Sequence, residues 1–327
     1  MILAGDVGAT KILLEVGDSR SGRWEPALSR RFATEGAASL SAILGAFLDE
    51  WRARPGTHRI TAAGFGVAGP ATGNRVKMTN RPWIVDGDAI ARRFHLPRVR
   101  VVNDLVASAH GIPWVPARES VSIQPGRATD TDPRVVIGVG TGLGICYLVP
   151  VDGKLREVPG EGGHSGFAPA TLDQAQLWHS IFASAGRVSA ESILSGPGLA
   201  NIHAFLRGRG VHTGDPKAPL PERITQAALD GSDDLCSAAL DLFVECLGSV
   251  AGDHALAAMT RGGVFLTGGI VGKILPRLRD GRFREAFRAK SPHSALLMRI
   301  PVRAIVSERV AVLGAARLAL DRRDKPG

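Results

Sequence analysis

Two turns built from small residues and threonine each follow a short apolar run of the chain. The first turn consists of Asp6, Val7, Gly8, Ala9 and Thr10, and the second of Gly140, Thr141 and Gly142. Such turns present backbone N–H groups and hydroxyls without side-chain bulk, which suits phosphate oxygens, and Asp6 is placed to hold a metal ion through water. Either turn alone is better explained as an ordinary tight hairpin. The presence of two, each with a threonine, favours phosphate binding.

Asn103 and Asp104 follow another apolar run, at the carboxyl end of an expected strand. Ligands of open α/β sheets bind at such ends. A carboxylate there can accept the proton of an attacking hydroxyl while the neighbouring amide orients the same substrate. The pair is also typical of a turn or a helix N-cap, with Asp104 capping a helix from 105 to 110. On spacing alone, capping is the stronger explanation.

A third group of polar residues lies among glycines. Glu161 and His164 belong to the run Gly160-Glu161-Gly162-Gly163-His164, and Glu191 precedes Leu194-Ser195-Gly196-Pro197-Gly198. A ligand with many hydroxyls needs several fixed polar groups of this kind. The alternatives are surface exposure for Glu161 and Glu191 and a satisfied core position for His164. Metal binding by His164 is less favoured because no second histidine lies at a usual ligand spacing.

Gly268 and Gly269 follow the apolar run 264–267 and are expected to open a helix. Their bare backbone could admit a purine or a ribose, although a plain strand-to-helix turn has the same sequence. The run 268–274 is no Walker A loop, because its first glycine is one residue too close to Gly-Lys and no Ser or Thr follows the lysine. Leu143 stands where a third dinucleotide-binding glycine belongs. P-loop and Rossmann folds are therefore disfavoured.

Apolar periodicity predicts the elements that position these residues. Short apolar runs bounded by turn residues predict strands, and spacings of three and four predict a helix over 40–51. A proline-rich connection follows residue 111, and the strand, threonine turn and strand of the N-terminus then recur. We therefore expect two similar α/β lobes, 1–110 completed by a C-terminal helix in 308–327, and 111–307. The expected strands are 2–5, 12–16, 60–67, 99–102, 135–139, 145–149, 264–267 and 300–306, and the later helices are 232–259 and 310–320.

The composition is that of an ordinary globular protein of 327 residues, with 44% hydrophobic and 22% charged residues. The formal charge of +9 comes from arginines scattered along helices, which favours a solvated basic surface over a nucleic-acid site. Cys146, Cys236 and Cys246 form no CxxC pair and are expected to be buried free thiols. No leader and no run of about 18 apolar residues is found, so we expect a cytoplasmic protein without a membrane span and with a frayed end over 322–327.

Taken in order, these motifs closely resemble the bacterial glucokinase family, over nearly the whole chain. The ordered set is specific although each motif alone is weak. The matching runs are Gly5-Asp6-Val7-Gly8-Ala9-Thr10, Met78-Thr79-Asn80, Val102-Asn103-Asp104, Gly140-Thr141-Gly142-Leu143-Gly144, Pro159-Gly160-Glu161-Gly162-Gly163-His164, Ser189-Ala190-Glu191, Leu194-Ser195-Gly196-Pro197-Gly198 and Gly268-Gly269-Ile270.

The resemblance implies a two-lobed actin-like ATPase fold, each lobe ribonuclease-H-like, with the active site in the interlobe cleft. By the same resemblance, Asp104 is the base for the sugar 6-hydroxyl, and Asn103, Glu161, His164 and Glu191 hold the sugar together with it. The two threonine turns bind ATP phosphates, and Gly268 and Gly269 bind adenosine. Mg²⁺ on the phosphates is implied, because phosphoryl transfer depends on charge neutralisation. A homodimer is implied as well.

The chain departs from the family pattern at two places. Ala9 replaces the second glycine of the usual Gly-Gly-Thr turn, which would cost about 1 kcal/mol if that backbone requires a positive φ. Ser165-Gly166 stands where the family often has an acidic residue two positions after the histidine. The cysteine-rich zinc motif of the related repressor group is absent, which favours the zinc-free branch and argues against a DNA-binding regulator.

We therefore expect ATP-dependent phosphorylation of glucose to glucose 6-phosphate and ADP, the entry step of glycolysis. Two alternatives are weighed against it. A kinase for mannose, glucosamine or fructose would keep Asp104 and vary the sugar contacts. A non-catalytic sugar-sensing protein of the same fold is disfavoured, because a binder needs no base at the reacting hydroxyl.

Overall fold

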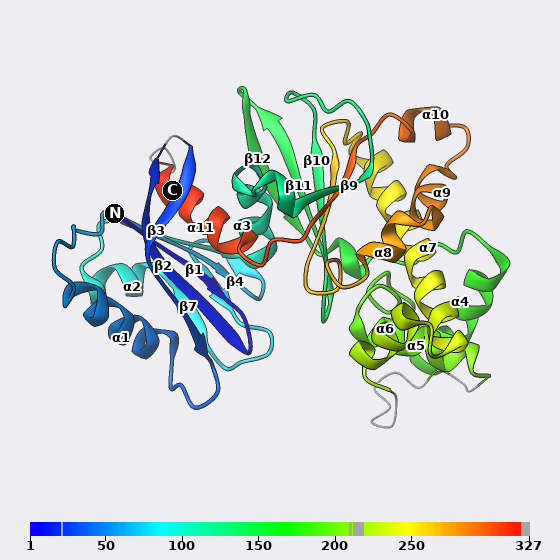
Figure 1. Ribbon diagram of the computed structural model, residues 1–327, viewed down its shortest axis with the longest axis horizontal. Helices are drawn as coiled ribbons and strands as arrows, with labels where there is room; N and C mark the ends of the chain where they lie inside the picture. The colour runs from blue at the N-terminus through cyan, green and yellow to red at the C-terminus, as the bar shows by residue number, and fades with distance from the viewer. Residues whose placement is uncertain (21, 209–210, 212–218, 322–327) are drawn as a thin grey trace. The chain divides into compact units, whose positions relative to one another are not determined.

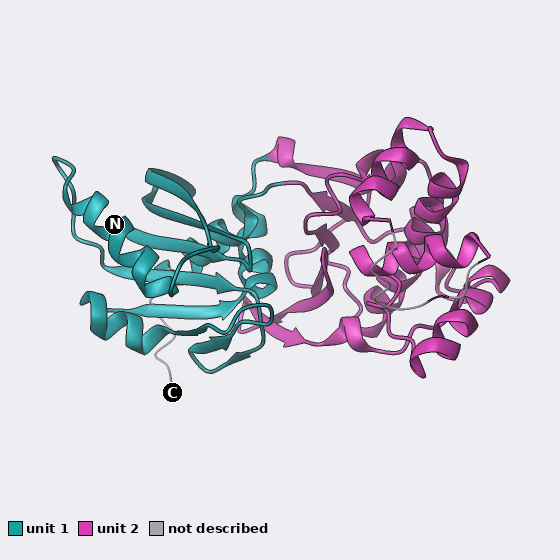
Figure 2. Cartoon of the chain, turned by 90° about the horizontal axis from the view of Figure 1, so that it is seen from below, with its two compact units in different colours: residues 1–116, 307–327 teal, residues 117–306 magenta. Residues whose placement is uncertain are grey.

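The computed structural model describes residues 1–20, 22–208, 211 and 219–321, so the expected frayed end at 322–327 lies outside the described residues. The chain forms two compact units, Met1–Pro116 with Ser307–Gly327, and Ala117–Val306 (Figure 2). We call them unit 1 and unit 2. The 3₁₀ turn η1 (Ile112–Trp114) packs on helix α11 (Val310–Leu320), so residues 111–116 go with unit 1. The lobe boundaries that the sequence predicts, 1–110 and 111–307, remain a prediction.

Unit 1 is built on a five-stranded sheet in the order β3-β2-β1-β4-β8. Strands β1, β2 and β3 pair antiparallel, whereas β4 and β8 continue the sheet parallel to β1, so the carboxyl ends of β1, β4 and β8 share one edge. Three short strands form a separate small sheet. The strands are β1 (Ile2–Val7), β2 (Lys11–Arg20), β3 (Arg23–Ala33), β4 (Ala62–Val67), β8 (Val99–Asn103), and β5 (Ala71–Thr72), β6 (Arg75–Lys77) and β7 (Ile84–Asp86).

Helices cover both faces of this sheet (Figure 1). Helices α1 (Leu40–Arg52) and α2 (Gly87–Phe94) share one apolar cluster with one face, and α11 forms a second cluster with the other face. Helix α3 (Asp104–Gly111) begins directly after β8 and packs along α11. The helix predicted over 40–51 is confirmed, with its apolar positions buried against the sheet.

Unit 2 repeats this design. Its sheet has the order β12-β11-β10-β13-β14-β9, in which β10, β11 and β12 are antiparallel, β13 and β14 continue parallel to β10, and β9 is added antiparallel. The expected pair of lobes with like topology is therefore confirmed. The strands are β9 (Ser120–Gln124), β10 (Arg134–Val139), β11 (Leu143–Val151), β12 (Lys154–Gly160), β13 (Val264–Thr267) and β14 (Val302–Ile305).

Most helices of unit 2 come after β12. They are α4 (Leu172–Ala185), α5 (Gly196–Leu206), α6 (Pro221–Asp230), α7 (Asp234–Ala257), α8 (Leu275–Arg279), α9 (Arg282–Arg288) and α10 (Ser294–Leu297), with the 3₁₀ turns η2 (Ala117–Glu119) and η3 (Gly162–His164). By length and composition α7 could cross a membrane, but 72% of its most apolar window is buried inside the protein, which is the burial expected of a core helix. The three cysteines are free and buried, as predicted.

Two expectations need correction. Gly268 and Gly269 do not open a helix, because residues 268–274 form turns and α8 begins only at Leu275. The basic surface of α8 and α9 is only partly solvated: Arg277 and Arg282 each form an ion pair with Asp241 at 3.1 Å. These arginines hold neighbouring helices together.

Candidate active site

The first threonine turn joins β1 to β2 and presents free backbone donors. The N–H of Gly8 donates to the carbonyl of Lys11 at 3.0 Å and closes the turn. Among the residues that the structure describes, nothing accepts a hydrogen bond from the N–H of Ala9 or Thr10. Unpaired N–H groups in such a turn form an anion-binding concavity. The geometry therefore suits the predicted role in holding phosphate.

Ala9 carries no backbone strain. In the described part of the chain, the only residues other than glycine with a positive φ are His95, Asp152 and Met259. The penalty that a positive φ would impose on alanine is therefore not incurred. The replacement of the usual glycine leaves the turn in an ordinary conformation.

Asn103 and Asp104 lie where β8 ends and α3 begins. Asn103 is the N-cap of α3: its Oδ1 accepts from the N–H of Leu105 at 2.9 Å and of Val106 at 3.3 Å. Its Nδ2 donates to the carbonyl of Gly69 at 3.0 Å, so the amide is fixed at both ends. Capping was thus the right structural explanation, but the cap is Asn103, and Asp104 is the first residue of the helix.

Asp6 and Asp104 lie at the shared edge of β1 and β8, and the charge of Asp104 influences the titration of Asp6. The pKa of Asp6 is raised to about 7, mainly by burial and also by the negative charge of Asp104, while the cations Lys11 and Arg31 act against both. Burial also raises the pKa of Asp104, against the lowering effect of hydrogen bonds, the N–H of Leu105 foremost. A carboxylate with a raised pKa next to a turn predicted to bind phosphate is a general-base candidate.

In unit 2 the second threonine turn joins β10 to β11 and is held from two sides. Gly140 donates its N–H to the carbonyl of Gly142 at 2.9 Å and accepts from the N–H of Gly196 at 2.8 Å. Thr141 is exposed at the tip of the turn. The turn is therefore held by its own backbone and by the start of α5, with its outer side open.

The turn Glu161–His164 lies directly on β11. A Cβ added to Gly163 would be 1.9 Å from the carbonyl oxygen of Leu143, and one added to Gly162 would be 2.9 Å from Ile145. Only glycine permits this approach. The neighbouring segment 163–167 pairs with 188–191 through the N–H groups of Phe167, Ala190 and Glu191.

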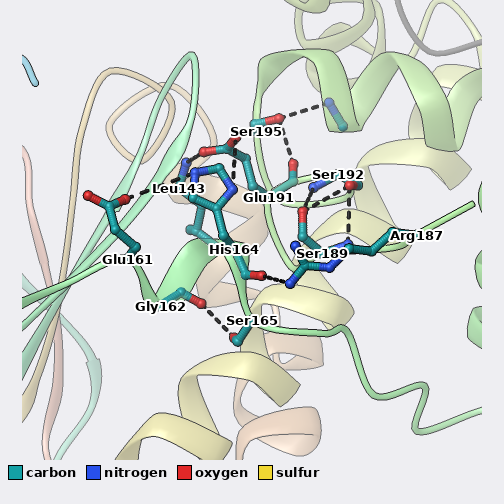
Figure 3. Close-up of polar contacts among 11 residues, drawn as sticks. Leu143, Glu161, Gly162, His164, Ser165, Arg187, Ser189, Glu191, Ser192 and Ser195 are labelled. Atoms are coloured by element: carbon teal, nitrogen blue, oxygen red, sulfur yellow. Dashed lines mark hydrogen bonds and ion pairs between the residues drawn. The ribbon is translucent and has the colours of Figure 1, made fainter. Parts of the chain in front are cut away.

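This pairing brings three predicted site residues together (Figure 3). His164 lies between two carboxylates, with its Nε2 4.0 Å from Glu161 and its Nδ1 3.8 Å from Glu191. The side chains of Glu161, His164 and Glu191 are 76%, 54% and 32% exposed, so His164 is not a satisfied core histidine. The cluster presents two acceptors and an imidazole to solvent, which suits a ligand rich in hydroxyls.

Glu191 also contacts the second threonine turn. Its Oε2 accepts a hydrogen bond from the N–H of Leu143 at 2.8 Å, and a Cβ on Gly142 would be 2.6 Å from that oxygen. Ser195 Oγ donates to the carbonyl of Glu191 at 2.8 Å. One carboxylate therefore joins the polar cluster to the turn 140–142 of the same unit.

Gly268 and Gly269 lie beside the end of β10. Gly268 has φ +103°, and a Cβ there would be 2.4 Å from the carbonyl oxygen of Val139, whereas nothing lies within 4 Å of a Cβ on Gly269. Ile270 donates its N–H to the same carbonyl at 3.2 Å. Gly268 is thus required by the backbone, and Gly269 opens free space next to the turn 140–142.

The predicted site residues therefore form one group in each unit. Unit 1 holds Asp6, Gly8, Ala9, Thr10, Asn103 and Asp104, and unit 2 holds Gly140, Thr141, Gly142, Glu161, His164, Glu191, Gly268 and Gly269. Sequence reasoning missed the side chains that support them, among them Tyr147, whose hydroxyl lies 2.7 Å from His254 Nδ1 behind the turn 161–164. No spacing indicates that pair, because 107 residues separate its members. The individual roles of the predicted residues stay predictions.

Comparison with known proteins gives one consistent result. A family model described as glucokinase matches residues 3–322. The chain is 40% identical to a glucokinase of Mesorhizobium japonicum over 97% of this chain and 91% of the relative. The crystal structure of a glucokinase from an Antarctic psychrotroph matches with TM-score 0.86 and 28% identity, over 97% of this chain and 98% of that one. A glucokinase of the ROK family from Streptomyces griseus, solved in complex with glucose and AMPPNP, shares the fold at 23% identity and TM-score 0.64, over 97% and 98% of the two chains.

Proposed function

The chain belongs to the glucokinase family, whose fold is the expected actin-like ATPase fold, and we propose that it transfers the terminal phosphoryl group of ATP to the 6-hydroxyl of glucose. The products are glucose 6-phosphate and ADP. The observation that carries this proposal is Asp104, a carboxylate of raised pKa at the sheet edge that also bears the turn Asp6–Thr10. A base and a phosphate-binding turn on one edge are what phosphoryl transfer to a hydroxyl requires.

Asp104 accepts the proton of the 6-hydroxyl as that oxygen attacks the terminal phosphorus. Its raised pKa brings its basicity closer to neutral pH, which favours proton transfer under working conditions. Asn103 holds this carboxylate at the start of α3, because its own amide is fixed by the helix and by Gly69. The expected contact of Asn103 with the sugar uses the donor capacity that remains on Nδ2.

The groups in unit 2 serve binding. Glu161, His164 and Glu191 accept and donate hydrogen bonds to the sugar hydroxyls, and Gly140, Thr141 and Gly142 hold phosphate oxygens. The open backbone at Gly268 and Gly269 accommodates adenosine. We propose that both groups act on the same two substrates, as the family resemblance implies.

Asp6 fits the Mg²⁺ that accompanies ATP. It is a half-buried carboxylate whose pKa is raised mainly by burial, so a nearby cation would stabilise its charged form. The described residues contain no group of three or more His, Cys, Asp or Glu side chains suited to a metal. The ion would neutralise charge on the phosphates, and Asp6 would hold it through water.

We further propose a cytoplasmic location and a homodimer, of which the homodimer rests on the family resemblance. The identity of the sugar substrate can be tested directly. Purified protein is mixed with Mg-ATP and glucose, mannose, fructose, glucosamine or N-acetylglucosamine, ADP release is followed, and the product is identified by ³¹P NMR. The proposal predicts glucose 6-phosphate and the highest kcat/KM for glucose. A higher kcat/KM for another hexose would support the alternative kinase, and no ADP release above background with any sugar would refute the proposal.

A further inference from the structure

The carbonyl oxygen of Ala9, in the first phosphate-binding turn, accepts hydrogen bonds from two side chains distant in sequence. Thr34 Oγ1 donates to it at 2.5 Å, and Arg81 Nε donates to it at 2.8 Å. Thr34 is fully buried just beyond β3, and Arg81 follows the motif at residues 78–80. One carbonyl of the turn is therefore fixed from two directions.

Arg81 is itself held in place. Its guanidinium carbon lies 5.6 Å from the centroid of the Trp83 ring, and Trp83 is buried. A guanidinium over an indole face is attracted by the ring's quadrupole. The ring and the carbonyl together fix the guanidinium next to the turn, so Arg81 is a rigid support of the turn.

Fixing the Ala9 carbonyl also fixes the next N–H. The Ala9–Thr10 peptide is trans, so the carbonyl of Ala9 and the N–H of Thr10 point in opposite directions within one plane. Thr10 is exposed, and no acceptor among the described residues takes its N–H. The two donors on the carbonyl thus direct a free N–H away from Thr34 and Arg81 and toward solvent.

We propose that Arg81 and Thr34 are positioning residues for the nucleotide, which hold the N–H of Thr10 in the direction that binds a phosphate group of ATP. This inference rests on the proposed function. Preorganised donors bind charge well because they need no rearrangement when the charge arrives. Neither side chain contacts Asn103 or Asp104 in the described hydrogen bonds, so the effect falls on the nucleotide and not on the sugar.

The experiment compares nucleotide and sugar binding in three variants. Arg81→Met removes the donor and keeps the apolar stem, Thr34→Val removes the hydroxyl at nearly constant volume, and Arg93→Met is the control. Arg93 is a suitable control because it lies over the ring of Phe94 at 5.7 Å in the same unit and does not contact the turn. Titration calorimetry gives the Kd of a non-hydrolysable Mg-ATP analogue and, separately, that of glucose.

We expect Arg81→Met to weaken analogue binding about tenfold, with the glucose Kd unchanged and Arg93→Met like the wild type. Thr34→Val should act in the same direction. Because both residues act through one carbonyl, the double variant should lose less than the product of the two single losses. Arg81→Lys keeps a donor and should recover part of the affinity.

Analogue binding that is unchanged in both single variants would overturn the inference, as would equal losses of analogue and glucose binding. If Arg81→Met does not fold, Thr34→Val decides the question. A wild type that binds the analogue but phosphorylates no sugar would refute the proposed function. The comparison of analogue binding among the variants could then still be interpreted. A wild type that does not bind the analogue would refute both.

Discussion

The carboxylate of Glu191 accepts the backbone N–H of Leu143 at 2.8 Å and thereby joins the polar cluster of unit 2 to the turn 140–142. The other oxygen of the same carboxylate lies 3.8 Å from His164 Nδ1. One side chain is thus shared between the proposed sugar contacts and the proposed phosphate contacts. A substitution of Glu191 should therefore weaken both the sugar contacts and the phosphate contacts.

We expect Glu191→Ala to raise KM for glucose and KM for ATP together, each by tenfold or more, since an unpaired buried N–H costs about 1–3 kcal/mol. Glu191→Gln keeps an acceptor for Leu143 and should raise mainly the KM for glucose. Steady-state kinetics with each substrate varied in turn measures both. Glu222→Ala, an exposed position on α6, is the control. An unchanged KM for ATP in Glu191→Ala would show that the hydrogen bond to Leu143 does not support the turn.

The glycines of the turn 161–164 provide a matched pair of variants. Gly163→Ala places a Cβ 1.9 Å from the carbonyl oxygen of Leu143, whereas Gly166→Ala places one in open space. The first should cost about 1–3 kcal/mol of unfolding free energy and raise the glucose Kd, because the turn must move off β11. The second should change neither. Urea unfolding and glucose titration of both variants check this, and an unaffected Gly163→Ala protein would contradict the described packing.

The half-buried pair Tyr147 and His254 is expected to support the same turn from behind. Burial lowers the pKa of His254, so its ring is neutral at pH 7 and able to share a hydrogen bond with the Tyr147 hydroxyl. Its Cε1 would be 3.3 Å from a Cβ on Gly162. Tyr147→Phe should raise KM for glucose severalfold while KM for ATP stays constant. His203→Gln, at a buried histidine of unit 2, controls for a general loss of stability. An equal rise of both KM values in Tyr147→Phe would mean that the pair stabilises the fold without a specific effect on the sugar contacts.

Asp6 should make the free protein less stable as the pH rises. Its pKa is about 7 in the folded protein against an ordinary value of 3.8, so the folded state holds a proton that the unfolded state releases. The stabilising contribution is complete below pH 3.8 and is lost as the pH rises through about 7. Asp6→Asn should flatten the fall in unfolding free energy between pH 3.8 and about 7, measured by urea unfolding, whereas Asp49→Asn on the exposed end of α1 should not. Identical pH profiles for Asp6→Asn and the wild type would mean that the folded protein does not raise the pKa of Asp6.

Sequence patterns indicated the buried elements best. The helix at 40–51 and the strand at 264–267 have apolar residues at the positions that the structure buries. Strands β3 and β12 were missed because most of their residues are exposed, and β3 also contains Pro26, so neither shows a clear alternation. The helix expected at Gly268 failed because a positive φ and the contact with Val139 keep that segment in turns.

The sequence indicated which residues belong to the candidate site, but not what supports them. Glu161, His164 and Glu191 were grouped by their glycine-rich context, and the structure brings them together through the pairing of 163–167 with 188–191. That pairing is non-local and leaves no local pattern. The same is true of Arg81 on Ala9, which lies 72 residues away along the chain. The question whether Ala9 is strained likewise needed backbone angles.

The central claim is that Asp104 is the base in phosphoryl transfer from ATP to glucose. The most direct test is Asp104→Asn, with kcat measured by ADP release and the glucose Kd measured separately by titration. Asparagine keeps the size of the side chain and an oxygen for the N–H of Leu105, so the start of α3 should persist. The account predicts that kcat falls at least 10²-fold, as for loss of a general base, while glucose still binds. A variant that retains wild-type kcat would contradict it.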